Sequence, residues 1–98
     1  MTDKLTAPYA QAAAVAAKDG SLARAKGIVS LQRTGAGRYT VTLEPHVNAL
    51  ESVPQATLNQ SADWNSEIYA KVVNASTVAV LTGVNGTATD EPFFLLIP

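Results

Sequence analysis

Two β-prone runs on either side of a glycine-bearing turn, within residues 26–44, constrain the fold more than any other feature of the chain. In the second run Tyr39, Val41 and Leu43 alternate with polar residues, the period-two pattern of a strand with one buried face. The intervening segment Gly35–Gly37 begins and ends with glycine, which tolerates the positive φ of a hairpin turn. A one-residue slip would expose all three apolar side chains, so the pattern fixes the register.

Four further short runs also have strand character, at residues 53–60, 66–73, 77–82 and 93–97. Six short strands with no long helix between them predict a mainly β protein, a small antiparallel β-sandwich or barrel. The chain of 98 residues is long enough for one domain with its own core. The run Phe93–Ile97 is apolar throughout, which predicts a central strand, or one held in an interface, with both faces covered.

The N-terminal quarter has a different composition, dominated by alanine. Alanine favours helix, so Tyr9–Lys18 is predicted to be a short helix, with Gly20 as its C-cap. Such a helix could bury little more than methyl groups, and a helix this short is marginal in water by itself. We therefore expect residues 1–25 to form an arm that becomes ordered on a partner or a neighbouring subunit, and residues 26–98 to form the β domain.

Charge is spread unevenly along the chain, although the formal net charge is only −1. Residues 1–38 hold six basic and two acidic side chains, whereas residues 39–98 hold one basic and six acidic side chains. This asymmetry indicates contact between a basic arm and an acidic surface, on the protein's own domain or on a neighbour's, or else two ordinary solvated faces. The candidate partner-binding residues are Tyr9, Lys18, Arg24, Lys26, Arg33 and Arg38. Direct nucleic-acid binding is not expected, because no aromatic residues are interleaved with these cations.

No motif for catalysis stands out, and we expect a protein that is not an enzyme, with no cofactor and no metal site. The chain has no cysteine, and its one histidine, His46, follows a proline in a predicted loop. A small hydrolase that uses His46 is the last-ranked alternative, since no nucleophile elbow accompanies it. Asp90 and Glu91 are interpreted as a solvated acidic turn and not as a cation site.

Trp64 and Tyr69 are the candidates for a surface platform. Trp64 lies in a polar turn, where it either folds back to cap the core or stays exposed to bind a sugar or a partner. The preferred prediction is the core cap. Tyr69 is predicted on the outer face of its strand, which supports an interface there.

The hairpin of residues 26–44, the later Thr77-Val-Ala-Val80 and the closing Asp90-Glu-Pro-Phe-Phe94 resemble a pattern in small virion proteins of tailed bacteriophages. The resemblance covers residues 26–98 and implies a capsid-decoration, head-fibre or tail-associated protein that has no catalytic activity. It also implies that the protein binds the major capsid protein or another virion protein and forms a homo-oligomer, with a trimer favoured. The N-terminal arm would make the contact with the assembly.

The N-terminus has neither a signal-peptide pattern nor a stretch of membrane-spanning length, which predicts a protein that stays in the cytoplasm where it is made or leaves by a route other than secretion. The resemblance then implies the virion as the location, after synthesis in the host cytoplasm. The main alternative is a carbohydrate-binding or receptor-binding β module of the tail-fibre type, which would use Trp64 and Tyr69.

Overall fold

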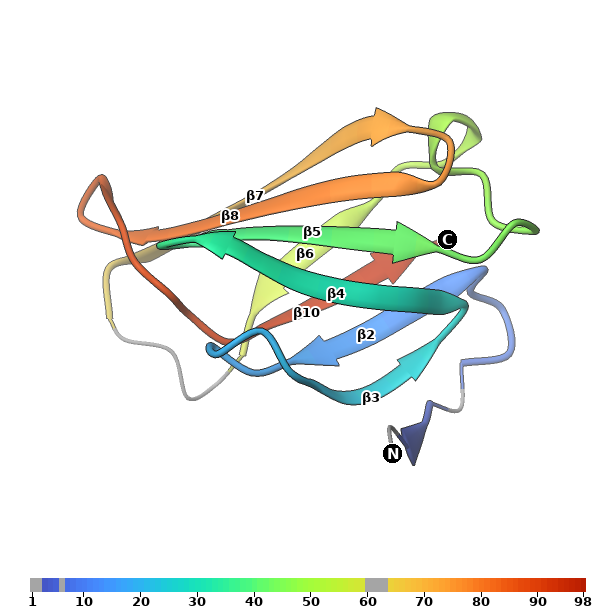
Figure 1. Cartoon of the computed structure of the whole chain (residues 1–98), viewed down its shortest axis with the longest axis horizontal. Helices are drawn as coiled ribbons and strands as arrows, with labels where there is room; N and C mark the ends of the chain where they lie inside the picture. Colours follow the sequence, from blue (N-terminus) through green and yellow to red (C-terminus); the bar gives the residue numbers. More distant parts are fainter. Residues whose placement is uncertain (1–2, 6, 60–63) are drawn as a thin grey trace.

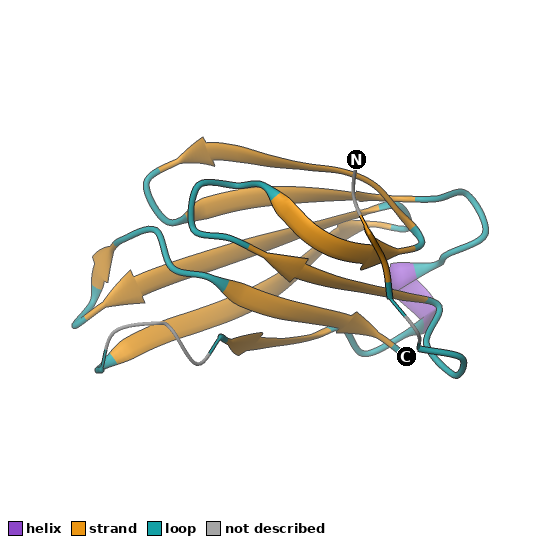
Figure 2. Ribbon diagram, turned by 90° about the horizontal axis from the view of Figure 1, so that it is seen from below, coloured by secondary structure: helices purple, strands orange, loops and turns teal. Residues whose placement is uncertain are grey.

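The computed structural model, which describes residues 3–5, 7–59 and 64–98, shows two β-sheets packed face to face (Figure 1, Figure 2). The first, sheet A, has the strand order β1 (Asp3–Lys4), β3 (Leu22–Lys26), β2 (Ala12–Ala16), β10 (Phe93–Ile97) and β6 (Gln55–Leu58). The second, sheet B, has the order β4 (Ile28–Gly35), β5 (Arg38–Leu43), β8 (Thr77–Val84) and β7 (Ser66–Asn74), with β9 (Thr87–Ala88) paired to the end of β8. All of these pairings are antiparallel except that of β1 with β3. The prediction of a mainly β sandwich is confirmed.

The hairpin that dominates the sequence is formed by β4 and β5, in the register set by its apolar pattern. Tyr39, Val41 and Leu43 are all buried, at 0–2% exposure, between the two sheets. Gly37 has φ +66°, and a Cβ at this position would lie 2.2 Å from the carbonyl oxygen of Thr82. The turn therefore needs glycine both for its backbone angle and for its close approach to β8.

The other predicted strands are also present, as β6, β7, β8 and β10. β10 is central in sheet A, between β2 and β6, as its apolar run indicates. Its inward residues Phe93, Leu95 and Ile97 are 0–2% exposed and form the middle of the core. Its outward residues Phe94 and Leu96 are each 39% exposed, so the expectation that both faces are covered holds only for the inner face.

The helix predicted for Tyr9–Lys18 is wrong, because this stretch contains strand β2. β2 pairs along its whole length with β10, and its inward residues Ala12, Ala14 and Ala16 are 0–3% exposed. Small side chains suit this position because the bulky residues of β10 fill the adjoining space. Tertiary pairing thus outweighs the helix propensity of alanine, which is worth only tenths of a kcal/mol per residue. Gly20, with φ +91°, lies in the turn that leads to β3 and not at a helix end.

The division into an arm of residues 1–25 and a β domain of residues 26–98 is corrected in the same way, since β2 and β3 belong to sheet A. The chain then passes from β3 into β4, and so from one sheet to the other, at Gly27. Gly27 has φ +68°, and a Cβ there would lie 2.6 Å from the carbonyl oxygen of Gln11. This tight corner connects the N-terminal strands to the hairpin as part of one core.

Candidate interaction surface

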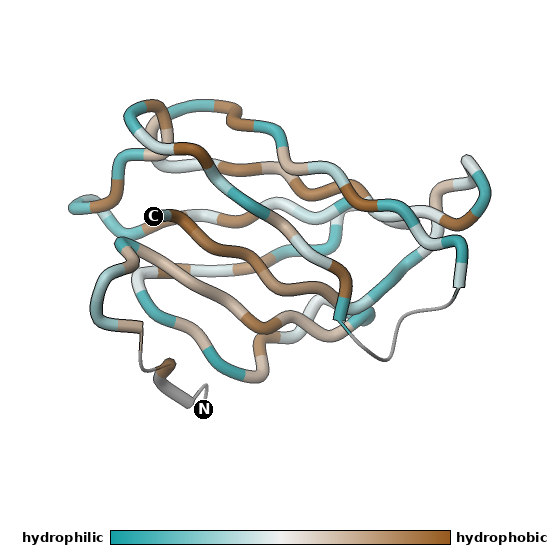
Figure 3. The backbone as a smooth tube through the Cα atoms, turned by 180° about the vertical axis from the view of Figure 1, so that it is seen from behind, coloured by the Kyte–Doolittle hydropathy of each residue, from teal (hydrophilic) through white to brown (hydrophobic). Residues whose placement is uncertain are grey.

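The outer face of sheet A carries the exposed apolar side chains of Phe94 and Leu96. Sheet A is seen from behind in Figure 3, where the brown trace ending at the C-terminus is β10. Successive side chains of a strand point to opposite faces, so Phe94 and Leu96 share the outer face while their neighbours fill the core. Strand register then identifies the residues beside them, because directly paired residues share a face.

Two rows of side chains cross this outer face at right angles to the strands, from β3 through β2 and β10 to β6. Both rows run in the same sense, from a cation through a small or β-branched apolar residue and a large apolar residue to a neutral polar residue. The first row is Arg24, Val15, Phe94 and Thr57, and the second row is Lys26, Ala13, Leu96 and Gln55.

The N-terminal residues border the rows on the β3 side. The backbone N–H of Leu5 donates to the carbonyl oxygen of Ala25 at 3.2 Å, and Nζ of Lys26 donates to the carbonyl oxygen of Ala7 at 2.6 Å. Beside them lies a hollow of about 290 Å³, lined by Leu5, Ala7 and residues of both rows. Tyr9, at 98% exposure, lines a neighbouring hollow together with Leu96. The face is therefore indented and apolar.

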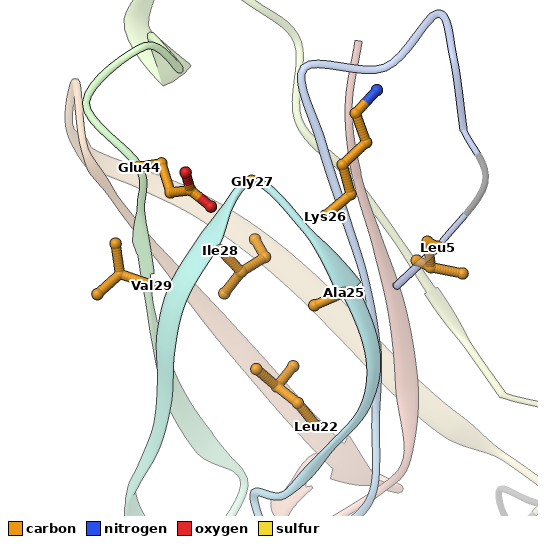
Figure 4. Close-up of a pocket in the computed structure, with 8 residues that line it drawn as sticks. All are labelled: Leu5, Leu22, Ala25, Lys26, Gly27, Ile28, Val29 and Glu44. Carbon is orange, nitrogen blue, oxygen red and sulfur yellow. The ribbon is translucent and has the colours of Figure 1, made fainter. Parts of the chain in front are cut away.

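A larger groove of about 580 Å³ opens where β3 and β4 diverge from the corner at Gly27 (Figure 4). Its lining includes the aliphatic side chains of Leu22 and Ile28, both packed against the core, and the charged residues Lys26 and Glu44. Lys26 is already bound by the N-terminal segment, and no cluster of catalytic groups lines this groove. Its shape is a consequence of the bend between the two sheets.

The predicted basic surface is divided between the two sheets. Arg24 and Lys26 belong to the rows on sheet A, and the exposed Tyr9 lies beside Leu96 of the second row. Arg38, exposed on β5, pairs with Leu81, which in turn pairs with Tyr69, so these three lie side by side on the outer face of sheet B. The sequence thus identifies cations that the fold does not bring together.

Arg33 and Lys18 instead contribute to a polar cluster that joins the two halves of the chain. Asp90 accepts hydrogen bonds from the backbone N–H of Gly37 and from Nε of Arg33, each at 2.7 Å. These bonds, the one from Gly37 above all, hold the pKa of Asp90 below its ordinary value, although partial burial opposes them. The Tyr39 hydroxyl donates to the carbonyl oxygen of Lys18 at 2.7 Å. Burial, together with the nearby carboxylate of Asp90, raises the pKa of Tyr39 to about 12. These hydrogen bonds connect the β4–β5 hairpin to the segment before β10 and to the residues that follow β2.

Trp64 is 93% exposed, so the preferred prediction that it caps the core is wrong. Tyr69 is 63% exposed on β7, on the outer face as predicted. A hollow of about 210 Å³ lies beside Tyr69, between it and Gly86 of the β8–β9 turn. Glu67 also lines this hollow, but its carboxylate accepts a hydrogen bond from the backbone N–H of Gly86. Trp64 does not line the hollow, so the two aromatic residues do not share one pocket.

The remaining candidates do not assemble a reactive site. His46 is exposed, and its Nδ1 lies 4.0 Å from the carboxylate of Glu44. Glu91 is 1% exposed and accepts a hydrogen bond from the Ser66 hydroxyl, and Asp90 has the partners given above. The interpretation as a solvated turn is therefore wrong for Glu91, whereas the side chain of Asp90 is 27% exposed. Within residues 3–5, 7–59 and 64–98, no group of three or more His, Asp or Glu residues could hold a metal ion.

The apolar centre of the two rows is the candidate feature that the sequence did not bring together. The signal was present in Phe93–Ile97, since only alternate residues of a strand can face the core. Without β2 recognised as a strand, nothing in the sequence placed Val15 beside Phe94.

No family model, curated protein or solved structure matches the chain. No helix in the described part is long and apolar enough to cross a membrane.

Proposed function

We propose that this protein is a non-enzymatic structural component of a bacteriophage particle, of the capsid-decoration or head-fibre type. It binds the major capsid protein or another virion protein as a homo-oligomer and stabilises the assembly. It is made in the host cytoplasm and resides in the virion. The assignment to a particle rests on the resemblance of residues 26–98 to small virion proteins.

One observation carries the part of the proposal that concerns protein contacts: the apolar centre of the two rows, with Phe94 and Leu96 each 39% exposed. Contiguous apolar area rimmed by polar residues is typical of protein-interaction sites. The molecule also has two broad exposed faces, one on each sheet. A homo-oligomer that decorates a shell needs two contact surfaces, one for its own copies and one for the shell. Because residues 12–25 belong to the sandwich, the proposed contacts use these faces and not a free arm of residues 1–25.

Mass spectrometry of density-purified particles from the strain that encodes the gene tests the proposal. We expect the protein at a fixed ratio to the major capsid protein, and particles from a gene deletion should lose integrity at a lower temperature. If the protein is absent from purified particles while abundant in the lysate, the proposal is wrong.

A second candidate function, a carbohydrate-binding or receptor-binding module, is favoured by the hollow beside Tyr69. An exposed aromatic side chain next to a small hollow can stack on a sugar ring. Glycan-array binding that Tyr69→Ala abolishes and Trp64→Ala leaves intact would support a site in that hollow. If no glycan binds, or if Tyr69→Ala has no effect on the binding, this candidate is removed.

A further inference from the structure

The two rows on the outer face of sheet A have an order that fits a second copy of the same face. We propose that two copies of this chain pack sheet A against sheet A, related by a twofold axis that runs parallel to the strands between β2 and β10. The inference deepens the homo-oligomer part of the proposed function, on which it rests, and does not depend on the assignment to a phage particle.

The symmetry operation determines which residues meet. Rotation by 180° about an axis along the strands reverses the order of the strands and keeps each residue's position along them. β10 of one copy therefore lies over β2 of the other, and β6 lies over the partner's β3. Each row is placed on its own counterpart in reverse, which is the self-complementary contact of a twofold interface.

Size is complementary in this arrangement. Phe94 meets the partner's Val15, and Leu96 meets the partner's Ala13, so each large side chain of β10 lies over a smaller one of β2. The hollow of about 290 Å³ beside the N-terminal residues gives the incoming Phe94 ring space to enter. Interfaces between copies favour such apolar, interdigitated centres.

The polar ends of the rows are compatible as well, because no two like charges meet. Arg24 meets the partner's Thr57, and Lys26 meets the partner's Gln55, so cationic donors lie against hydroxyl and amide oxygens. Neither row contains an acidic residue, and Lys26 already has the carbonyl oxygen of Ala7. β3 and β6 are separated by three inter-strand gaps of about 4.8 Å, so the reversal keeps the two Arg24 side chains roughly 14 Å apart across the sheet.

The available area determines how strong the contact can be. Sheet A is five strands wide at about 4.8 Å per strand, and β3, β2 and β10 are five residues long at about 3.3 Å per residue, so the sheet covers roughly 400 Å² before side-chain relief and flanking loops are added. This is about half of the roughly 800 Å² per partner of a standard interface, so the contact corresponds to a weak dimer. Two sheets stacked face to face lie about 10 Å apart, as they do inside a sandwich.

Thr57→Lys and Arg24→Glu test the pairing by charge reversal, because both side chains are exposed and point away from the core. Thr57→Lys places a second cation against Arg24 at both ends of the dimer. We expect at least about a tenfold increase in the dimer dissociation constant, measured by analytical ultracentrifugation. The double variant T57K/R24E should recover dimerisation. Thr87→Lys, the same substitution at an exposed site on β9, should leave it unchanged, and thermal melts check that every variant is folded.

Paired cysteines test the geometry directly, since the chain has no cysteine of its own. Arg24 of one copy faces Thr57 of the other across a sheet separation of about 10 Å, which is too far for a direct disulfide, whereas Arg24 and Thr57 of one chain are about 14 Å apart within the sheet. A short bifunctional thiol reagent that spans about 10 Å should therefore join R24C/T57C into a covalent dimer at both ends of the interface, whereas R24C or T57C alone should not cross-link. A ladder of longer species would indicate head-to-tail contacts and overturn the proposal.

Several results would contradict the twofold pairing: a monomer at high concentration, a trimer, a dimer insensitive to Thr57→Lys, or a dimer that R24C/T57C fails to cross-link. A chain that is monomeric in solution and still present in purified particles would refute this pairing alone. Absence from the particles with an intact R24C/T57C dimer would refute only the particle assignment.

Discussion

Ala14→Leu should destabilise the protein strongly, because β2 is a buried strand and not a mobile helix. Ala14 is 3% exposed, faces the core, and is paired with Leu95 on β10. Its neighbours on the same face of β2, Ala12 and Ala16, are at most 1% exposed, so the new side chain would point into the packed interior between the sheets. Extra methylene groups in a packed core cost about 1–3 kcal/mol. For a domain of this size, each kcal/mol lowers Tm by roughly 4–8 °C.

Urea and thermal unfolding, followed by circular dichroism, measure this effect. Ala23→Leu is the matched control, because Ala23 is exposed on β3 and the same substitution there should stay within about 0.5 kcal/mol of the parent. In a helical arm outside the core, both substitutions would be nearly neutral. If Ala14→Leu is as stable as Ala23→Leu, the assignment of β2 to the core is wrong.

Three further changes test the fold elsewhere. Asp90→Asn should lower the free energy of unfolding by about 1 kcal/mol, because it weakens the hydrogen bonds that join Asp90 to the β4–β5 hairpin. The pKa of Asp90 is lowered on folding, so its contribution to the free energy of unfolding is present above about pH 4 and is lost as the pH falls through the folded-state pKa. Asp90→Asn should therefore reduce the loss of stability between pH 7 and pH 3, measured by urea melts at both pH values. Because the pKa of Tyr39 is raised to about 12, its contribution to the free energy of unfolding is complete below about pH 10 and is lost as the pH rises toward 12. Ultraviolet titration should show one tyrosine that ionises at higher pH than the others. Simultaneous ionisation of all tyrosines would contradict the buried hydroxyl. Gly27→Ala should lower the free energy of unfolding by more than about 2 kcal/mol, because its Cβ would lie 2.6 Å from the carbonyl oxygen of Gln11 in addition to the penalty of a left-handed backbone. Gly86→Ala is the control, because a Cβ there meets nothing within 4 Å and should cost only the backbone penalty of about 1–2 kcal/mol. Equal costs would contradict the tight corner at Gly27.

The proposed twofold dimer also gives a reason for the composition of Phe93–Ile97. A strand in a sheet with one exposed face normally alternates apolar and polar residues. The outward positions of β10 carry Phe94 and Leu96 instead. Packing against a second copy would cover those side chains, in agreement with the expectation that this strand is central or held in an interface.

The sequence by itself determined those elements whose signal is local. The alternation of Tyr39, Val41 and Leu43 established the hairpin and its register, because a strand with one buried face has only one arrangement that keeps all three side chains from water. The centrality of β10 also follows from its composition alone.

Tertiary structure decided what depends on partners far apart in the chain. Ala12–Ala16 has the composition of a helix, and only pairing with β10, about eighty residues later, makes it a buried strand. The same pairing places Val15 beside Phe94 and so creates the rows on sheet A, while it distributes the predicted cations over two faces. Propensity contributes tenths of a kcal/mol per residue, whereas burial of a large apolar side chain contributes about 1.5–3 kcal/mol. The non-local term therefore wins wherever the two disagree.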